Sequence, residues 1–182
     1  VFEIKSKLGL ATVRVVGAGA AGLECTRVLG ERGFEGIHLV DAAADVGGYA
    51  AMAASLPGLS EWRRLIDYRV YQIQKLPNVE LIKNTRLNAD EVLAYGANIV
   101  VMANGSHWAA DGFNHVTRAP IEGHHLSHVF TPEGVLLRNA KIGERVLVYD
   151  CDGHIMGSGL AERFARAGHR VTLITPLAKI AQ

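Results

Sequence analysis

The stretch from Val15 to Asp41, VVGAGAAGLECTRVLGERGFEGIHLVD, has the layout of a strand, a glycine turn, a helix and a second strand. The apolar run 12–16 predicts a buried parallel strand that leads into the turn. Apolar residues then recur at helical spacing, with charged residues on the other face, as far as Gly33. A second apolar run, 37–40, follows at the separation that a right-handed crossover requires. The stretch therefore predicts a β-α-β unit.

The glycines of this turn, Gly17, Gly19 and Gly22, fit the pattern G-x-G-x-x-G. The first glycine of the pattern permits a tight turn, the second lets the backbone approach a pyrophosphate, and the third lets helix and strand pack closely. The helix N-terminus also offers free N–H groups and about half a positive charge to phosphates. Asp41 ends the second strand 19 residues after Gly22, where its carboxylate can accept hydrogen bonds from adenosine ribose hydroxyls and would repel a 2′-phosphate. The turn predicts an adenine nucleotide site; a ligand-free glycine turn and a solvated Asp41 are the alternatives.

The segment from Val146 to Thr175, VLVYDCDGHIMGSGLAERFARAGHRVTLIT, repeats the layout with aspartates in the turn. Asp150 and Asp152 stand where G-x-G would be, and they suit a helix N-terminus but would repel the pyrophosphate of NAD or NADP. We therefore predict no nicotinamide cofactor in this unit. The alternative, that both aspartates only cap the helix, has the same consequence. His154 beside them is more typical of a local hydrogen-bonding residue than of a catalyst.

Further elements lie between the two units. Ser60 can cap an amphipathic helix that Pro77 stops. The runs 79–82 and 98–103 have the apolar character of buried strands. With the two β-α-β units, they predict an α/β protein with a Rossmann-like, FAD/NAD(P)-binding fold, a parallel sheet and the start of a second β-α-β unit.

Residues 106–139 are rich in His, Gly, Pro and Asn and predict loops and short edge strands, with a helical turn opening at Thr131. Within them, His124, His125 and His128 could place two imidazoles near one metal ion. Only Glu122 could add a further ligand, so a solvated loop is the favoured interpretation.

The composition limits the classes of function. The 182 residues carry a net charge of about +1 without a basic run, which argues against a nucleic-acid partner. No apolar stretch is long enough to span a membrane, and the first ten residues lack the apolar core of a signal peptide, so we expect a cytoplasmic protein. The two cysteines, Cys25 and Cys151, form no C-x-x-C pair and predict reduced thiols. Two cysteines are too few for an iron–sulfur cluster. Cys25 lies on the first predicted helix with no cysteine nearby, which excludes the redox-active pair of a disulfide reductase.

Several phrases together resemble a known family: the glycine turn with its acid, DVGG, SLPGLSEWRRLIDYRVYQIQKL and DCDGHIMGSGLAERFARAGHRVTLIT. They are similar to the nucleotide-binding region of the trimethylamine and histamine dehydrogenases, and in turn to dimethylamine dehydrogenase, N-methylproline demethylase and the dienoyl-CoA reductases. The resemblance covers nearly the whole chain from residue 12. It implies a glutathione-reductase-like fold, with an ADP- or FAD-binding domain at 12–140 and the start of a degenerate second domain at 141–182. In the family, a TIM barrel that carries FMN and a 4Fe-4S cluster precedes this region.

The resemblance also implies which residues bind the cofactor, an ADP moiety that is either free or part of FAD. The implied residues are Gly17, Gly19, Ala20, Ala21, Gly22, Asp41, Gly47, Gly48, Asn104 and Gly105. This chain departs from the family at one of them, because relatives have Ala-Thr-Gly where it has Ala103-Asn104-Gly105. Asparagine keeps a hydrogen-bonding side chain but changes its shape, which puts a flavin contact there in doubt. Gly47 and Gly48 also fit an ordinary loop turn.

These observations favour the nucleotide-binding region of a multidomain flavoprotein oxidoreductase. We identify no catalytic residue in the sequence. We therefore expect substrate oxidation on a flavin of the barrel domain, and electron transfer to a carrier such as an electron-transfer flavoprotein. Two alternatives stay open. One is a noncatalytic module in which ADP is structural, and the other is a small NAD(P)H-dependent reductase that uses the second unit.

Overall fold

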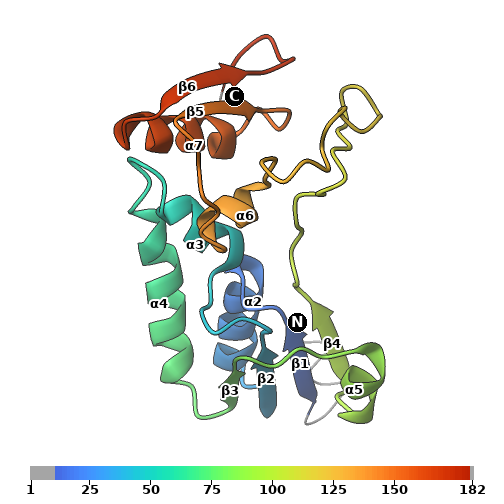
Figure 1. Ribbon diagram of the computed structural model, residues 1–182. Helices are drawn as coiled ribbons and strands as arrows, with labels where there is room; N and C mark the ends of the chain where they lie inside the picture. The colour runs from blue at the N-terminus through green and yellow to red at the C-terminus, as the bar shows by residue number, and fades with distance from the viewer. Residues whose placement is uncertain (1–10, 181–182) are drawn as a thin grey trace. The chain divides into compact units, whose positions relative to one another are not determined.

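The computed structural model describes residues 11–180 (Figure 1). The prediction that no signal peptide occupies the first ten residues lies outside this range. The contacts divide the chain into two compact units. The first comprises the described residues up to Ala51 together with Glu61–Gly105, and the second comprises Met52–Ser60 together with the chain from Ser106. The two units divide the chain after Ala51, Ser60 and Gly105. The predicted domain boundary at residue 140 stays a prediction.

The first unit contains a parallel sheet of four strands in the order β3-β2-β1-β4. The strands are β1 (Thr12–Val16), β2 (Gly36–Val40), β3 (Val79–Ile82) and β4 (Ile99–Met102). In the register, Val15 of β1 lies opposite Leu39 of β2 and Val101 of β4. The carboxyl ends of all four strands therefore meet at one edge of the sheet, where α/β folds place their ligands.

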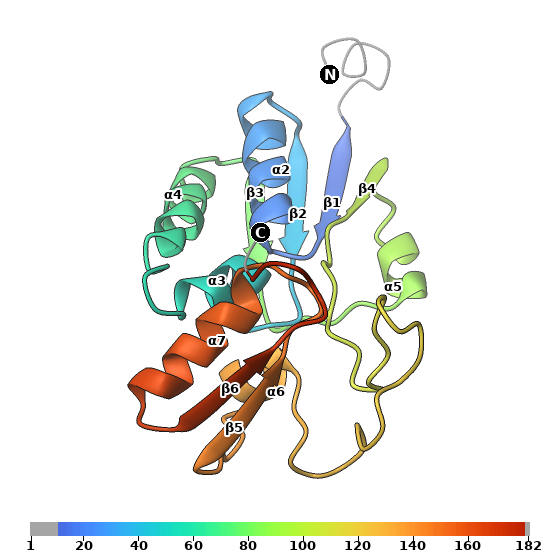
Figure 2. The same cartoon turned by 90° about the horizontal axis from the view of Figure 1, so that it is seen from above.

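Helices α2 (Ala20–Glu31), α4 (Trp62–Gln74) and α5 (Ala89–Ala94) belong to this unit, whereas α3 (Gly48–Ala54) begins in it and ends in the second unit. Helices α2 and α4 lie side by side along one face of the sheet (Figure 2). The core between them and the strands consists of fully buried side chains, among them Val13, Val15, Leu23, Ile37, Leu39, Ile66 and Ile73. This packing holds the turn after β1 against the start of α2.

The second unit contains a parallel pair of strands, β5 (Arg145–Tyr149) and β6 (Arg170–Ile174), with helix α7 (Ile155–Arg166) between them in the chain. A short helix, α6 (Pro132–Leu136), precedes them. The core of the second unit is formed by Met52, Leu56, Met156, Leu160 and Phe164. The second predicted β-α-β unit is therefore present as a unit with its own core.

The predicted fold class, a Rossmann-like α/β fold with a parallel sheet, is confirmed. The predicted helical turn at Thr131 is α6, where Thr131 accepts a hydrogen bond from the Gly134 N–H at 3.4 Å. The predicted cap of α4 is wrong. Ser60 lies in the turn one residue before the N-cap position, which is occupied by Glu61 and has no side-chain cap. Helices α3 and α5 were not predicted, because both are short.

Two further findings concern the residues that the structure describes. None of their helices combines the length and the apolar character that crossing a membrane requires. Across the same range, no three His, Cys, Asp or Glu side chains gather in a way that could hold a metal ion. Both cysteines are free thiols.

Candidate functional site

The first and third glycines of the turn after β1 are required by the protein itself. Gly17 has φ +104°, a conformation that other residues rarely adopt, and a Cβ there would collide with the carbonyl oxygen of Ala103. A Cβ on Gly22 would collide with the carbonyl oxygen of Gly17. The close approach of β1, β4 and α2 thus explains both residues without any ligand.

Gly19, the second glycine, differs from the other two. Its φ of −72° and ψ of −176° suit any residue, and a Cβ built on it would meet no protein atom within 4 Å. The next two side chains, those of Ala20 and Ala21, are small and exposed. No steric contact among the described residues therefore requires a glycine here, and the backbone beside Gly19 is open to approach from outside.

Helix α2 begins at this open backbone with its N–H groups uncapped. Gly19 is the N-cap residue and forms no side-chain cap, and the first turn holds no acidic side chain. The first N–H groups of a helix have no partner inside the helix, and the helix dipole adds a partial positive charge. This N-terminus is therefore suited to bind an anion, and phosphate groups are the common choice at such a position.

Asp41 is tied to the glycine turn from the end of β2. Its Oδ2 accepts a hydrogen bond from the Ala18 N–H at 2.5 Å, and its Oδ1 accepts one from the Ala43 N–H at 2.7 Å. An ionised carboxylate offers about four lone-pair positions, so Asp41 retains capacity for further donors. A ribose hydroxyl is such a donor. The predicted strand-end acid is thus half-buried and positioned beside the turn rather than directed into solvent.

Gly47 and Gly48 pack against the same turn. The Gly47 N–H donates to the carbonyl oxygen of Ala18 at 2.8 Å, and Gly47 forms an isolated parallel bridge with Gly19. Its φ is +113°, and a Cβ would collide with the Ile66 side chain. A Cβ on the exposed Gly48 would lie 3.4 Å from Cα of Gly19. Both positions therefore need glycine for a turn that borders Gly19.

Asn104 and Gly105 lie directly after β4 at the same edge of the sheet. Cα of Asn104 is 2.8 Å from where a Cβ of Gly17 would lie, and the Asn104 side chain is exposed. Gly105 has φ +67° with open space around it. The structure thus brings all ten predicted residues to one edge of the first unit, and their role in binding is taken up under the proposed function.

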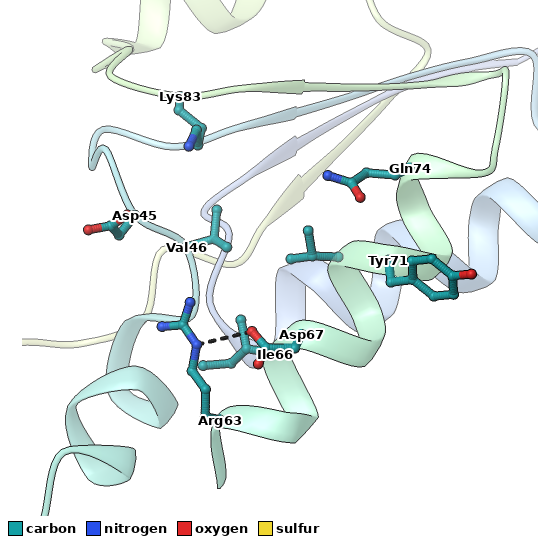
Figure 3. Close-up of a pocket in the computed structure, with 9 residues that line it drawn as sticks. Asp45, Val46, Arg63, Ile66, Asp67, Tyr71, Gln74 and Lys83 are labelled. Carbon is teal, nitrogen blue, oxygen red and sulfur yellow. Dashed lines mark hydrogen bonds and ion pairs between the residues drawn. The ribbon is translucent and has the colours of Figure 1, made fainter. Parts of the chain in front are cut away.

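A cavity that the sequence did not predict lies next to this edge. It has a volume of about 280 Å³ and lies between the loop after β2, helix α4 and the end of β3. Figure 3 shows Lys83 on the strand side of the cavity and Arg63 on the helix side, where the Arg63 Nε donates to an Asp67 oxygen at 3.0 Å. Lys83 follows Ile82, whose carbonyl oxygen accepts a hydrogen bond from the Asp41 N–H at 2.9 Å.

Glu24 and Cys25 of α2 have shifted pKa values. The hydrogen bond from Arg27 lowers the pKa of Glu24 below its ordinary value. Burial raises the pKa of the Cys25 thiol, because the thiolate would be poorly solvated. Cys25 is therefore a protonated thiol at neutral pH and a poor nucleophile. Neither shift produces an acid, base or nucleophile at the glycine turn.

Comparison with known proteins shows which proteins this chain is similar to. Residues 15–80 match the NAD(P)-binding Rossmann-like domain, and residues 130–179 match the OYE-like second alpha/beta domain. Dimethylamine dehydrogenase from Hyphomicrobium sp. (strain x) is 46% identical over 170 residues, which cover 90% of this chain and 23% of that protein. The chain is homologous to the trimethylamine and histamine dehydrogenase family.

Two solved structures agree with this family. Histamine dehydrogenase from Rhizobium sp. 4-9 aligns with a TM-score of 0.85 and 42% identity, over 92% of this chain and 26% of that one. The 6-hydroxypseudooxynicotine amine oxidase from Pseudomonas geniculata N1 aligns with a TM-score of 0.84 and 40% identity, over 91% of this chain and 24% of that one. The predicted resemblance to the trimethylamine and histamine dehydrogenase family is confirmed. The chain spans about a quarter of the length of these relatives.

Proposed function

We propose that the first unit binds the ADP moiety of a cofactor, either free ADP or the ADP half of FAD, at the glycine turn after β1. The observation that carries this proposal is the open backbone at Gly19, a glycine that no steric contact among the described residues requires. A ligand that must pass close to the chain accounts for it. The uncapped N-terminus of α2 and the adjacent Asp41 supply the matching chemistry.

In this proposal each predicted residue has a physical role. The N–H groups at the start of α2, from Ala20 to Gly22, and the backbone of Gly47-Gly48 donate to the diphosphate. Asp41 accepts from the ribose hydroxyls with the lone pairs that Ala18 and Ala43 leave free. Asn104 and Gly105 border the continuation of the ligand, which would be the flavin side if the ligand is FAD. A fixed negative charge at Asp41 disfavours a 2′-phosphate.

We further propose that the chain is the nucleotide-binding region of a multidomain flavoprotein oxidoreductase that acts on amines. Two amine dehydrogenases and an amine oxidase are among the homologues of highest identity, and this chain spans about a quarter of their length. In such an enzyme a barrel domain would hold FMN and a 4Fe-4S cluster, which would supply the redox chemistry, and a carrier such as an electron-transfer flavoprotein would accept the electrons. We assign no catalytic side chain among the described residues, and the two cysteines of the chain cannot supply a four-cysteine cluster site.

A second candidate function is a noncatalytic module in which bound ADP is structural. The exposed position of the Asn104 side chain favours it over a flavin contact. In this case ADP stabilises the folded unit through binding linkage alone. A small NAD(P)H-dependent reductase is disfavoured, since a buried carboxylate, Asp150, occupies the turn of the second unit.

The decisive experiment identifies the ligand directly. The purified chain is denatured, and the released small molecules are measured by mass spectrometry together with the visible absorbance of the native protein. ADP without colour supports the structural role, and FAD with flavin absorbance supports the flavin role. If nothing is released, the chain is titrated calorimetrically with ADP, where one equivalent is expected to bind. Absence of both ADP and FAD binding to the folded chain would contradict the proposal.

A further inference from the structure

The first residue of the turn forms the same backbone hydrogen bond in both units. The Gly17 N–H donates to the carbonyl oxygen of Val40, the last residue of β2, at 2.8 Å. The Asp150 N–H donates in the same way to Ile174, the last residue of β6, at 2.8 Å. Each is the first residue after its strand. Asp150 therefore takes the structural place of Gly17.

The starts of the two helices also correspond. The third residue of α2 is Gly22, and the third residue of α7 is Gly157. A Cβ on Gly22 would collide with the backbone of Gly17, whereas a Cβ on Gly157 would collide with the side-chain carboxylate of Asp150. In both units the glycine makes room for the first residue of the turn. In the second unit, what fills that room is a negatively charged group.

The environment of Asp150 is that of a bound anion. The residue is only 4% exposed, and its Oδ1 accepts hydrogen bonds from the N–H groups of Asp152 at 3.1 Å and Gly153 at 3.0 Å. Its Oδ2 is buried beside Gly157 without a hydrogen-bond partner among the described residues. Helix α7 has 12 residues, and its N-cap residue, His154, forms no side-chain cap. The positive end of the α7 dipole is thus left to the Asp150 carboxylate.

We propose that Asp150 is a built-in anion of the second unit, which takes up the turn N–H groups and the helix dipole that a dinucleotide phosphate would use in a Rossmann-like turn and so closes this unit to NAD and NADP. The carboxylate accepts hydrogen bonds from the turn N–H groups and interacts favourably with the positive end of the helix dipole, as a phosphate would. It also repels any incoming phosphate. The second unit keeps the fold of a dinucleotide-binding domain, but its ligand is part of the chain.

The test removes the carboxylate and supplies an external anion. Asp150→Gly creates the space and the free N–H groups of an ordinary glycine turn. In the ¹⁵N-glycine-labelled chain, inorganic phosphate is expected to shift the Gly153 and Gly157 amide signals saturably in Asp150→Gly. No such shift is expected in the wild type or in the control Asp152→Gly, whose lost side chain is the exposed hydrogen-bond partner of Trp108. The readout lies in the second unit, so it does not depend on ADP binding by the first.

A second variant separates charge from size. Asp150→Asn keeps the volume and loses the charge, so we expect a melting temperature about 4–8 °C lower and no response of the Gly157 signal to phosphate. Asp152→Asn is expected to melt close to the wild type. If Asp150→Gly folds only in the presence of phosphate, the proposal is supported.

Three results would overturn the proposal. One is a folded Asp150→Gly variant whose glycine signals ignore phosphate. Another is a failure of this variant to fold at any phosphate concentration, since an external anion should replace the lost one. The third is a saturable shift of Gly153 and Gly157 when NADH is added to the wild type.

Discussion

Gly17 and Gly19 are two residues apart in one turn, yet they lack a side chain for different physical reasons. At Gly17 the reason is the backbone: φ is +104°, and the carbonyl oxygen of Ala103 fills the space of a Cβ. At Gly19 the conformation is ordinary and the space is open. Gly17 is therefore required for the stability of the fold, whereas we assign Gly19 to ligand binding.

Gly17→Ala is expected to destabilise the first unit. The added methyl group has to adopt a positive φ and also displace the end of β4, and incompatible substitutions of this kind cost at least about 2 kcal/mol. Thermal or urea unfolding measures the loss. Gly96→Ala is a matched control, since Gly96 also has a positive φ of 68° but no neighbour within 4 Å of a Cβ. Equal losses in the two variants would show that the collision with Ala103 does not matter.

Gly19→Ala is expected to leave the stability within about 0.5 kcal/mol of the wild type, because its methyl group enters open space in a common conformation. Under the proposed function the same methyl group lies between the backbone and the diphosphate. The affinity for ADP should therefore fall at least about tenfold, which corresponds to about 1.4 kcal/mol. Calorimetric titration of the folded variant measures this change. Unchanged ADP affinity would remove the main support for the diphosphate position.

At the scale of elements, helix α2 is attached to α4 by charge as well as by apolar packing. Glu24 of α2 accepts a hydrogen bond from Arg27 in its own helix at 2.6 Å, and it forms an ion pair with Arg69 of α4 at 2.9 Å. Its side chain is 38% exposed, so water screens both interactions. The lowered pKa of Glu24, caused first by Arg27, records the preference for the ionised form in the folded state.

This preference predicts a pH dependence with a definite sign. A lowered pKa means that the ionised form stabilises the fold at pH values above the ordinary glutamate pKa, and that this contribution is lost as pH falls through the lowered value. Glu24→Gln should therefore cost about 0.5 kcal/mol at pH 7 and close to nothing at pH 2. Paired unfolding curves of wild type and variant test it. Glu162→Gln, which removes one ion pair within α7, is the control, and a cost for Glu24→Gln that grows on acidification would contradict the sign.

The elements also show how far the sequence could predict the fold. Strand β1, the glycine turn and α2 are local patterns of apolar period and glycine position, so they were predictable. Arg14 was not: it is 7% exposed within the apolar strand β1, and its guanidinium lies 3.4 Å from the ring centre of Tyr95, just after α5. A partner so far along the chain leaves no local signal. The same holds for the cavity between α4 and Lys83, which only the folded chain assembles.

At the scale of the whole molecule, the chain contains two turns that each connect a parallel strand to a helix but differ in what lies in the turn. The first presents open backbone at Gly19, and the second holds the buried carboxylate of Asp150. The sequence predicted the contrast from aspartates in place of glycines. It could not predict that Asp150 lies against Gly157, because the second turn has five residues, 150–154, where the first has three, 17–19. The longer turn shifts the register of the G-x-G-x-x-G pattern.

The contrast predicts that an adenine nucleotide protects one turn and not the other. With ADP at 100 times its dissociation constant, binding linkage stabilises the first unit by about 2.7 kcal/mol, so amides there that exchange through unfolding should slow by up to about 100-fold. Hydrogen exchange followed by mass spectrometry should show this protection at 17–22 and 41–43, and unchanged exchange at 150–157. Adenosine, which lacks the diphosphate, is the control and should protect the segment at 17–22 less. Protection at 150–157 as strong as at 17–22 would mean that the second turn also receives the nucleotide, against both the open Gly19 and the filled Asp150 position.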